Sequence, residues 1–100
     1  MIENPGFKKE NTGRIHVLVS GKVQGVFFRV NTAKKAKEEK LVGWVRNTDD
    51  GRVEIVAEGE RGSLGRFIQF LNKGPTAAEV KEVLIEEKEP KGEKGFKVVN

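Results

Sequence analysis

Segments in which every second residue is apolar alternate along the chain with segments whose apolar residues recur at helical spacing. Alternation with a period of two predicts half-buried strands over Ile15 to Ser20, Val42 to Thr48 and Val53 to Glu58. The pair Asp50-Gly51 predicts a tight hairpin between the last two, because glycine accepts the positive φ that such turns require. We therefore expect the second and third strands to pair antiparallel.

Two more strands are predicted near the C-terminus. Three apolar residues mark the fourth strand: Val80, Val83 and Ile85. The alternation slips within this segment, which predicts a bulge near Lys81-Glu82. Phe96 and Val98 predict a short terminal strand.

Two helices are predicted between these strands. The first spans about Phe28 to Lys40, and small residues that allow close approach to a sheet form its inward stripe: Thr32, Ala33 and Ala36. The second is expected to open at Gly62-Ser63, with Ser63 as its N-cap, and to end at Gly74-Pro75. Its apolar residues follow helical spacing: Leu64, Phe67, Ile68 and Leu71.

The element order β-α-β-β-α-β with a short fifth strand indicates a ferredoxin-like fold. Because each helix has one apolar stripe, the two helices should cover a single face of the sheet. We expect an α+β sandwich with an antiparallel sheet in the order 4-1-3-2, in which the third strand lies between the first two. Glu54, Glu58 and Glu60 are expected to be solvated edge charges.

One domain is expected from 100 residues, with residues 1–13 as a flexible tail and residues 14–100 as the folded part. The chain has no cysteine and one histidine, which excludes a disulfide scaffold and argues against a zinc site. Neither a membrane span nor a signal-peptide core is found, so we expect a small cytoplasmic monomer.

The formal net charge of +4 lies in the N-terminal half, where residues 1–50 hold ten basic and six acidic groups. This asymmetry favours an anionic partner. Lysines 34, 35, 37 and 40 are equally well explained as the solvated face of a helix.

The segment Gly21–Arg29 is the strongest candidate for chemistry, because it leaves a strand and runs directly into a helix. The first N–H groups of a helix have no intrahelical partner, and the helix dipole favours an anion there. Gly21 and Gly25 allow successive N–H groups to converge, and Arg29 could grip two phosphate oxygens. A plain strand-to-helix turn with a solvated arginine would have the same pattern.

Two motifs in this sequence resemble the signatures of the acylphosphatases: G-x-V-Q-G-V-x-F-R over residues 21–29 and G-W-V-R-N-x-x-D-G-x-V-E over residues 43–54. The resemblance covers about residues 14–100 and implies a small ferredoxin-like enzyme that hydrolyses carboxyl-phosphate anhydrides. The sequence departs from the family at Lys40, where the family often has glycine.

The resemblance also implies the roles of individual residues. Arg29 matches the family's phosphate-binding arginine, and Asn47 matches the asparagine that orients the attacking water. The residues whose backbone amides would hold the phosphate are Gln24, Gly25, Val26, Phe27, Phe28 and Arg29. The family's reaction uses no metal or other cofactor and forms no phosphoenzyme.

Elementary chemistry is compatible with these roles. An acyl phosphate expels a carboxylate whose conjugate acid has a pKa of roughly 4, so the leaving group needs little help from a general acid. Phosphoryl transfer to water then depends on positioning and on charge stabilisation. The expected partners are a small acyl phosphate as substrate and inorganic phosphate as product and inhibitor.

Two other functions are consistent with the topology. RNA-recognition domains share it, but they stack bases on aromatic residues of strands one and three, and neither strand here contains one. An accessory domain that binds acyl or carbamoyl phosphate within a larger protein is the second alternative, and the short chain favours the free enzyme. We therefore expect no nucleic acid and no membrane among the partners.

Overall fold

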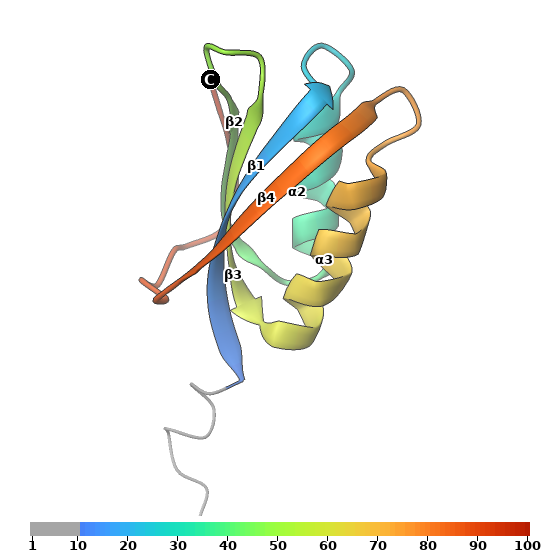
Figure 1. Ribbon diagram of the computed structural model, residues 1–100. Coiled ribbons are helices and arrows are strands. Elements are labelled where there is room, and N and C mark those ends of the chain that lie inside the picture. Colours follow the sequence, from blue (N-terminus) through green and yellow to red (C-terminus); the bar gives the residue numbers. More distant parts are fainter. Residues whose placement is uncertain (1–10) are drawn as a thin grey trace, which may run out of the picture.

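The fold is a five-stranded sheet with two helices on one of its faces (Figure 1). The computed structural model describes residues 11–100. The elements in chain order are β1 (Thr12–Lys22), α2 (Phe28–Glu38), β2 (Val42–Asn47), β3 (Val53–Glu60), α3 (Arg61–Lys73), β4 (Glu79–Lys88) and β5 (Phe96–Val99). All the predicted elements are present, so the ferredoxin-like α+β architecture is confirmed.

The strand order is β4-β1-β3-β2-β5, which contains the predicted order 4-1-3-2. The pairs β1–β3, β1–β4 and β2–β3 are antiparallel, as expected. The pair β2–β5 is parallel, so the prediction of an entirely antiparallel sheet is wrong for the last strand. The reason is the path of the chain: β4 ends at the end of the sheet where β2 begins, and residues 89–95 carry it across to start β5 beside β2.

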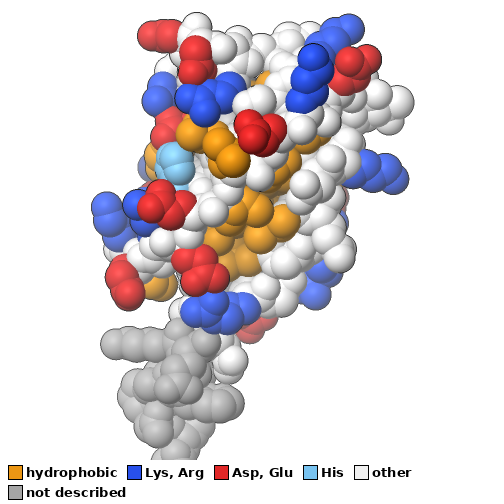
Figure 2. Space-filling view, in the orientation of Figure 1, with side chains coloured by type: hydrophobic (Ala, Val, Ile, Leu, Met, Phe, Trp, Pro, Cys, Tyr) orange, Lys and Arg blue, Asp and Glu red, His pale blue; other side chains and the backbone are white. Residues whose placement is uncertain are grey.

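The core lies between the sheet and the helices. Alternate residues of β1 and β3 point into it: Ile15, Val17, Val19, Val53, Ile55 and Ala57. From the helices, Phe28 and Phe67 are fully buried, and the ring of Phe67 meets that of Phe96 edge to face at 6.2 Å. Truncating either of these buried rings to alanine would cost about 3–5 kcal/mol. Figure 2 shows a band of apolar side chains on one outer face, bordered by charges of both signs.

Helix α2 ends at Glu38, two residues before the predicted end at Lys40. Lys40 has a φ of 60°, which is left-handed and cannot continue a helix. Its N–H donates to the carbonyl of Lys37 at 3.1 Å, and that of Leu41 donates to the carbonyl of Ala36 at 2.9 Å. These two bonds form a Schellman motif, which normally places glycine at this position.

Helix α3 begins at Arg61, directly after β3, so the prediction of Ser63 as its N-cap is wrong. The flanking residue is Glu60, whose backbone is extended and whose side chain forms no cap. Ser63 lies inside the first turn, buried, where its Oγ accepts a bond of 3.4 Å from Arg66. The predicted stop is confirmed, since the helix ends at Lys73 and Gly74 has a φ of 74°.

The predicted bulge in β4 is also confirmed, because pairing with β1 passes from Glu82 to Val80 and leaves out Lys81. Of the predicted tail, residues 1–10 lie outside the described residues, whereas Thr12 and Gly13 belong to β1. The division of the chain at residue 13 thus remains a prediction. No helix within residues 11–100 is long and apolar enough to cross a membrane.

The prediction that Glu58 is a solvated edge charge is wrong, because β3 lies inside the sheet and Glu58 is only 6% exposed. Its carboxylate pairs with Arg14 and accepts N–H bonds from Lys91 at 2.8 Å and Gly92 at 3.0 Å. We call Arg14, Glu58 and residues 91–93 the carboxylate clasp. It holds the β4–β5 connection against the face of the sheet that the helices leave uncovered.

Candidate active site

Three segments meet at one end of the sheet: the loop between β1 and α2, the β2–β3 hairpin and the C-terminal end of the chain (Figure 1). The loop makes two left-handed turns, at Gly25 with a φ of 74° and at Phe27 with a φ of 60°. A left-handed residue followed by a helical one, as in Phe27-Phe28, is the backbone pattern that turns successive N–H groups toward one point. The loop therefore has the backbone geometry of an anion-binding concavity.

The start of α2 provides a positive electrostatic environment beside this loop. Within residues 11–100 no side chain caps the helix, and its first turn contains no acidic residue. Asn31 fixes the preceding backbone instead: its N–H and its side-chain Nδ2 both donate to the carbonyl of Phe27, at 3.0 and 2.9 Å. The uncapped amides and the helix dipole together favour a bound anion.

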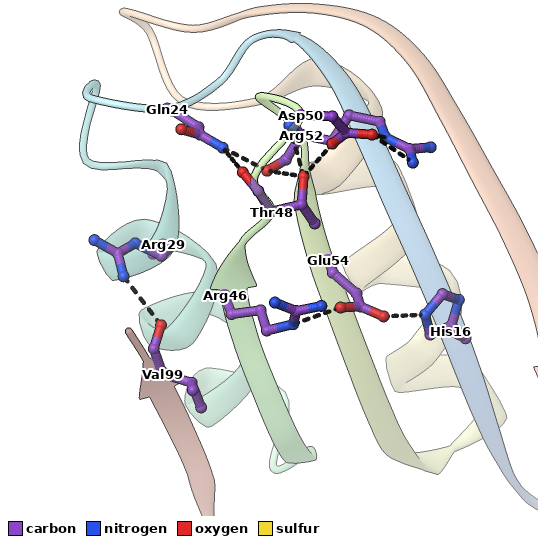
Figure 3. Close-up of polar contacts among 9 residues, drawn as sticks. All are labelled: His16, Gln24, Arg29, Arg46, Thr48, Asp50, Arg52, Glu54 and Val99. Carbon is purple, nitrogen blue, oxygen red and sulfur yellow. Dashed lines mark hydrogen bonds and ion pairs between the residues drawn. The ribbon is translucent and has the colours of Figure 1, made fainter.

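Arg29 is the second residue of α2, and its guanidinium is held by the C-terminal end (Figure 3). Nη1 donates to the carbonyl oxygen of Val99 at 3.0 Å and to Oδ1 of Asn100 at 3.1 Å. Among the described residues, Nε and Nη2 have no hydrogen-bond acceptor. Two of the three guanidinium nitrogens therefore remain available for a bidentate ligand.

Asn47 is the last residue of β2 and lines the same surface depression as Arg29. Its Oδ1 is buried, yet it accepts no hydrogen bond from any described residue. A buried amide oxygen without a donor costs about 1–3 kcal/mol, so Asn47 carries an unsatisfied acceptor in the residue set that lines the depression.

The depression has a volume of about 330 Å³, at the small end of the range for ligand pockets. Its lining consists of Val23, Gly25, Phe27, Phe28, Arg29, Val30 and Asn47. Four predicted loop residues thus lie around it together with Asn47, whereas Gln24 and Val26 do not line it. A hollow of about 500 Å³ lies at the opposite end of the sheet, between the start of β1 and the end of β4.

The side chain of Gln24 has a structural contact that the sequence did not reveal. Its Nε2 donates to the carbonyls of Thr48 and Arg52, both at 2.8 Å, and so ties the loop to the hairpin that follows Asn47 (Figure 3). A glutamine beside a glycine carries no pattern that would indicate this long-range bond. The contact fixes the distance between the loop and Asn47.

The hairpin is held by its own polar network. Thr48 Oγ1 bonds to the Asp50 carboxylate and accepts the N–H of Arg52 at 2.9 Å, and Gly51 has a φ of 91°. Hydrogen bonds from Arg52 and Thr48 lower the pKa of Asp50 to about 2. Asp50 is therefore a turn-forming carboxylate, ionised at neutral pH, as the Asp-Gly pair indicated.

The fold and the position of this depression define a ferredoxin-like α+β protein whose strand-to-helix loop carries the site. A sequence model of the acylphosphatase family matches residues 15–98. An acylphosphatase from Trichormus variabilis is 48% identical over 85 residues, which are 85% of this chain and 84% of that protein. The chain belongs to the acylphosphatase family, which confirms the family and the enzyme class predicted from the sequence.

Solved structures agree with this assignment. An acylphosphatase from Coxiella burnetii is 48% identical, with a TM-score of 0.88 over 92% of this chain and 97% of that one. HypF from T. kodakarensis is 33% identical with a TM-score of 0.77, and the match covers 88% of this chain but 12% of that protein. The same domain thus also occurs as a small part of a larger protein.

Proposed function

We propose that this chain hydrolyses the carboxyl-phosphate bond of acyl phosphates by direct attack of a water molecule held by Asn47 on a phosphate held by Arg29 and the loop. The observation that carries the proposal is that Arg29 and the unpartnered Oδ1 of Asn47 line one depression at the start of α2. The first supplies positive charge for the phosphate, and the second supplies an acceptor for the water.

The phosphate would lie where the loop amides and the helix dipole favour negative charge. Nε and Nη2 of Arg29 would donate to two of its oxygens, while Nη1 stays bonded to Val99 and Asn100. Amides of the segment Gln24–Phe28 would bind the remaining equatorial oxygen. Because the peptide dipoles are already oriented, they stabilise charge on the phosphoryl group without reorganisation.

The water would donate one hydrogen bond to Oδ1 of Asn47 and attack phosphorus in line with the scissile bond. The P–O bond to the acyl group breaks as the new P–O bond forms, and the electron pair leaves with the carboxylate. The proton of the attacking water passes to a phosphate oxygen, which gives inorganic phosphate. Because the leaving group is a stable carboxylate, the reaction needs no general acid.

Benzoyl phosphate in the presence of EDTA provides the first test. We expect steady hydrolysis with competitive inhibition by inorganic phosphate, and Arg29→Ala should lower kcat/KM by about 10³-fold or more. Arg66→Ala is the matched control, because Arg66 lies on the surface of α3 and bonds to Glu39 and Ser63, away from the depression. An inactive wild-type enzyme, or an active Arg29→Ala variant, would contradict the proposal.

The role of Asn47 has its own test. Asn47→Ala should lower kcat by about 10²–10³-fold while inorganic phosphate still inhibits at similar concentrations, because the variant loses the water and keeps the phosphate ligands. Asn72→Ala on α3, where Nδ2 donates to the carbonyl of Ile68, should leave kcat unchanged. A normal kcat in Asn47→Ala would refute the assignment of the water to this residue.

The oligomeric state and the cellular location are further proposals. A cytoplasmic monomer is supported by a sequence without cysteine and by the presence of Arg29, Asn47 and the loop in one chain. Light scattering at the concentrations used for the assays tests the first point, and cell fractionation tests the second.

A further inference from the structure

Two adjacent phenylalanines at the site have opposite environments. Phe28 is 1% exposed and packs in the core, whereas Phe27 is 77% exposed and lines the depression. Phe27 also has a left-handed backbone, with a φ of 60° and a ψ of 24°, which is strained for a bulky side chain. Neither burial nor backbone preference accounts for an aromatic residue at this position.

The strained conformation is fixed by contacts that do not involve the ring. Both Asn31 bonds go to the carbonyl of Phe27, so the backbone is anchored while the side chain projects outward. Val30 lies three residues further along, on the same side of the helix, and is 59% exposed. We call Phe27 and Val30 the apolar rim, since both line the depression and both are exposed.

The depression is therefore polar where it is deep and apolar where it opens. Asn47 presents a buried oxygen, and Arg29 is half-buried, whereas the apolar rim faces solvent. In an in-line displacement the leaving group departs on the side opposite the attacking water. With the water on the buried Asn47 oxygen, the acyl group would leave on the side away from Asn47, and the exposed apolar side chains of the lining are those of Phe27 and Val30.

We propose that the apolar rim binds the acyl portion of the substrate, and that the enzyme prefers acyl phosphates with aromatic or long aliphatic acyl groups to acetyl or carbamoyl phosphate. This inference rests on the proposed function and adds a substrate class to it. The ring of Phe27 provides a flat apolar surface against which such a group stacks or packs. Small polar acyl groups cannot use this surface and are held by the phosphate alone.

The test compares benzoyl with acetyl phosphate. Phe27→Ala should lower kcat/KM for benzoyl phosphate about five- to tenfold more than kcat/KM for acetyl phosphate, and this difference should lie mainly in KM. Phe27→Tyr keeps the ring and should retain the wild-type preference. Leu84→Ala is the matched control, because Leu84 is 47% exposed on β4 and does not line the depression.

Binding provides a second readout that does not depend on turnover. Calorimetry should show that Phe27→Ala raises the Kd of benzylphosphonate about five- to tenfold more than the Kd of inorganic phosphate. A change of the same size for both ligands would mean that Phe27 only shapes the loop, and it would overturn the proposal.

The remaining outcomes separate the two proposals. If the wild-type enzyme hydrolyses neither substrate but Phe27→Ala still weakens benzylphosphonate selectively, the proposed function and the substrate preference fail, and the apolar rim stands only as a binding surface for an apolar group. If both substrates are hydrolysed with an unchanged preference in Phe27→Ala, the rim proposal fails alone. A dimer that dissociates in Phe27→Ala, with the preference unchanged, would make the rim a self-association surface and would also overturn it.

Discussion

Lys40 stands at the position in the α2 terminus where the backbone favours glycine. Its φ of 60° is left-handed, and its side chain is exposed, so no packing contact repays the steric cost. The neighbouring bonds from Lys40 and Leu41 nevertheless hold the turn in place. The departure from the family at this residue thus affects stability, and it lies outside the lining of the site.

Lys40→Gly should raise the free energy of unfolding by about 0.5–1 kcal/mol. Removing the Cβ relieves a strain of about 1–2 kcal/mol. The greater freedom of glycine in the unfolded chain offsets part of this gain. Urea denaturation measures the change. Lys37→Gly is the control: Lys37 is helical, so glycine there should cost about 1 kcal/mol. If Lys40→Gly instead lowered the free energy of unfolding, the stabilisation from the lysine side chain would exceed the strain of its left-handed backbone.

At the scale of residues, the sequence motifs identified Arg29, Asn47 and the loop, because these residue types have a chemical reason to occur together. The side-chain bonds of Gln24 and the outward ring of Phe27 were not predictable. The bonds of Gln24 depend on how two segments far apart in sequence meet, and neighbouring residues do not encode that. Phe27 and Phe28 are identical side chains whose environments differ only because one precedes the helix and the other begins it.

Among the elements, β2 depends on a glycine for its pairing with β3. Gly43 has a φ of 142°, and a Cβ there would lie 1.9 Å from the carbonyl oxygen of Val56. No side-chain rotation relieves a clash with backbone. The strand therefore tolerates only glycine at this position, where it is paired with β3 on one side and β5 on the other.

Gly43→Ala should lower the free energy of unfolding by about 3 kcal/mol or more, since the strands must separate locally to admit the methyl group. Thermal and urea unfolding followed by circular dichroism measure this loss. Gly65→Ala is the paired variant: Gly65 lies within α3, and a Cβ there would meet no described atom of another element within 4 Å, so alanine should stabilise the protein by about 0.5–1 kcal/mol. Equal effects of the two substitutions would contradict the steric argument.

Hydrophobic periodicity predicted every helix and strand, but it placed helix ends less well. The start of α3 was missed because Ser63 has the chemistry of an N-cap, while the chain turns into the helix two residues earlier, directly from β3. The parallel direction of β5 was missed because short strands carry no sign of their partner's direction. Only the crossing of residues 89–95 over the sheet determines it.

At the scale of the whole molecule, the carboxylate clasp joins β1, β3 and the connection that leads to β5. Burial raises the pKa of Glu58. Hydrogen bonds to its carboxylate lower the pKa by more than that, and the donors are the Lys91 amide, the Arg14 guanidinium and the amides of Gly92 and Glu93. The pKa of Glu58 therefore lies below the ordinary 4.5. A carboxyl group whose pKa is lower in the folded state stabilises that state above the unfolded pKa. The stabilisation is lost as the pH falls through the folded pKa.

We therefore expect the free energy of unfolding to decline once the pH falls below about 4.5, the ordinary pKa, and to continue declining through the folded pKa of Glu58. Glu58→Gln should lower the free energy of unfolding by about 2–3 kcal/mol at pH 7, because the buried guanidinium of Arg14 then has one carboxylate fewer. On acidification the free energy of unfolding of this variant should fall less than that of the wild type. Glu86→Gln is the control, since Glu86 is exposed and its ion pair is with the neighbouring Lys88 of the same strand. Parallel pH profiles for wild type and Glu58→Gln would refute this role.

The uncovered face of the sheet differs in composition from that of RNA-recognition domains with the same topology. β1 and β3 contain no phenylalanine, tyrosine or tryptophan, and Glu54 bonds to His16 and Arg46, both at 2.6 Å. A polyanion would meet carboxylates where such domains place stacking residues.

The sheet register has a consequence for how the molecule reaches its folded state. A short turn joins β2 to β3, whereas other pairings bring together residues as distant in sequence as Arg14 with Lys88 and Gly43 with Phe96. Closing such long loops is entropically costly before any contact rewards it. The chain should therefore fold more slowly than a helical bundle of equal length, with the hairpin available early and the edge strands completing the sheet last.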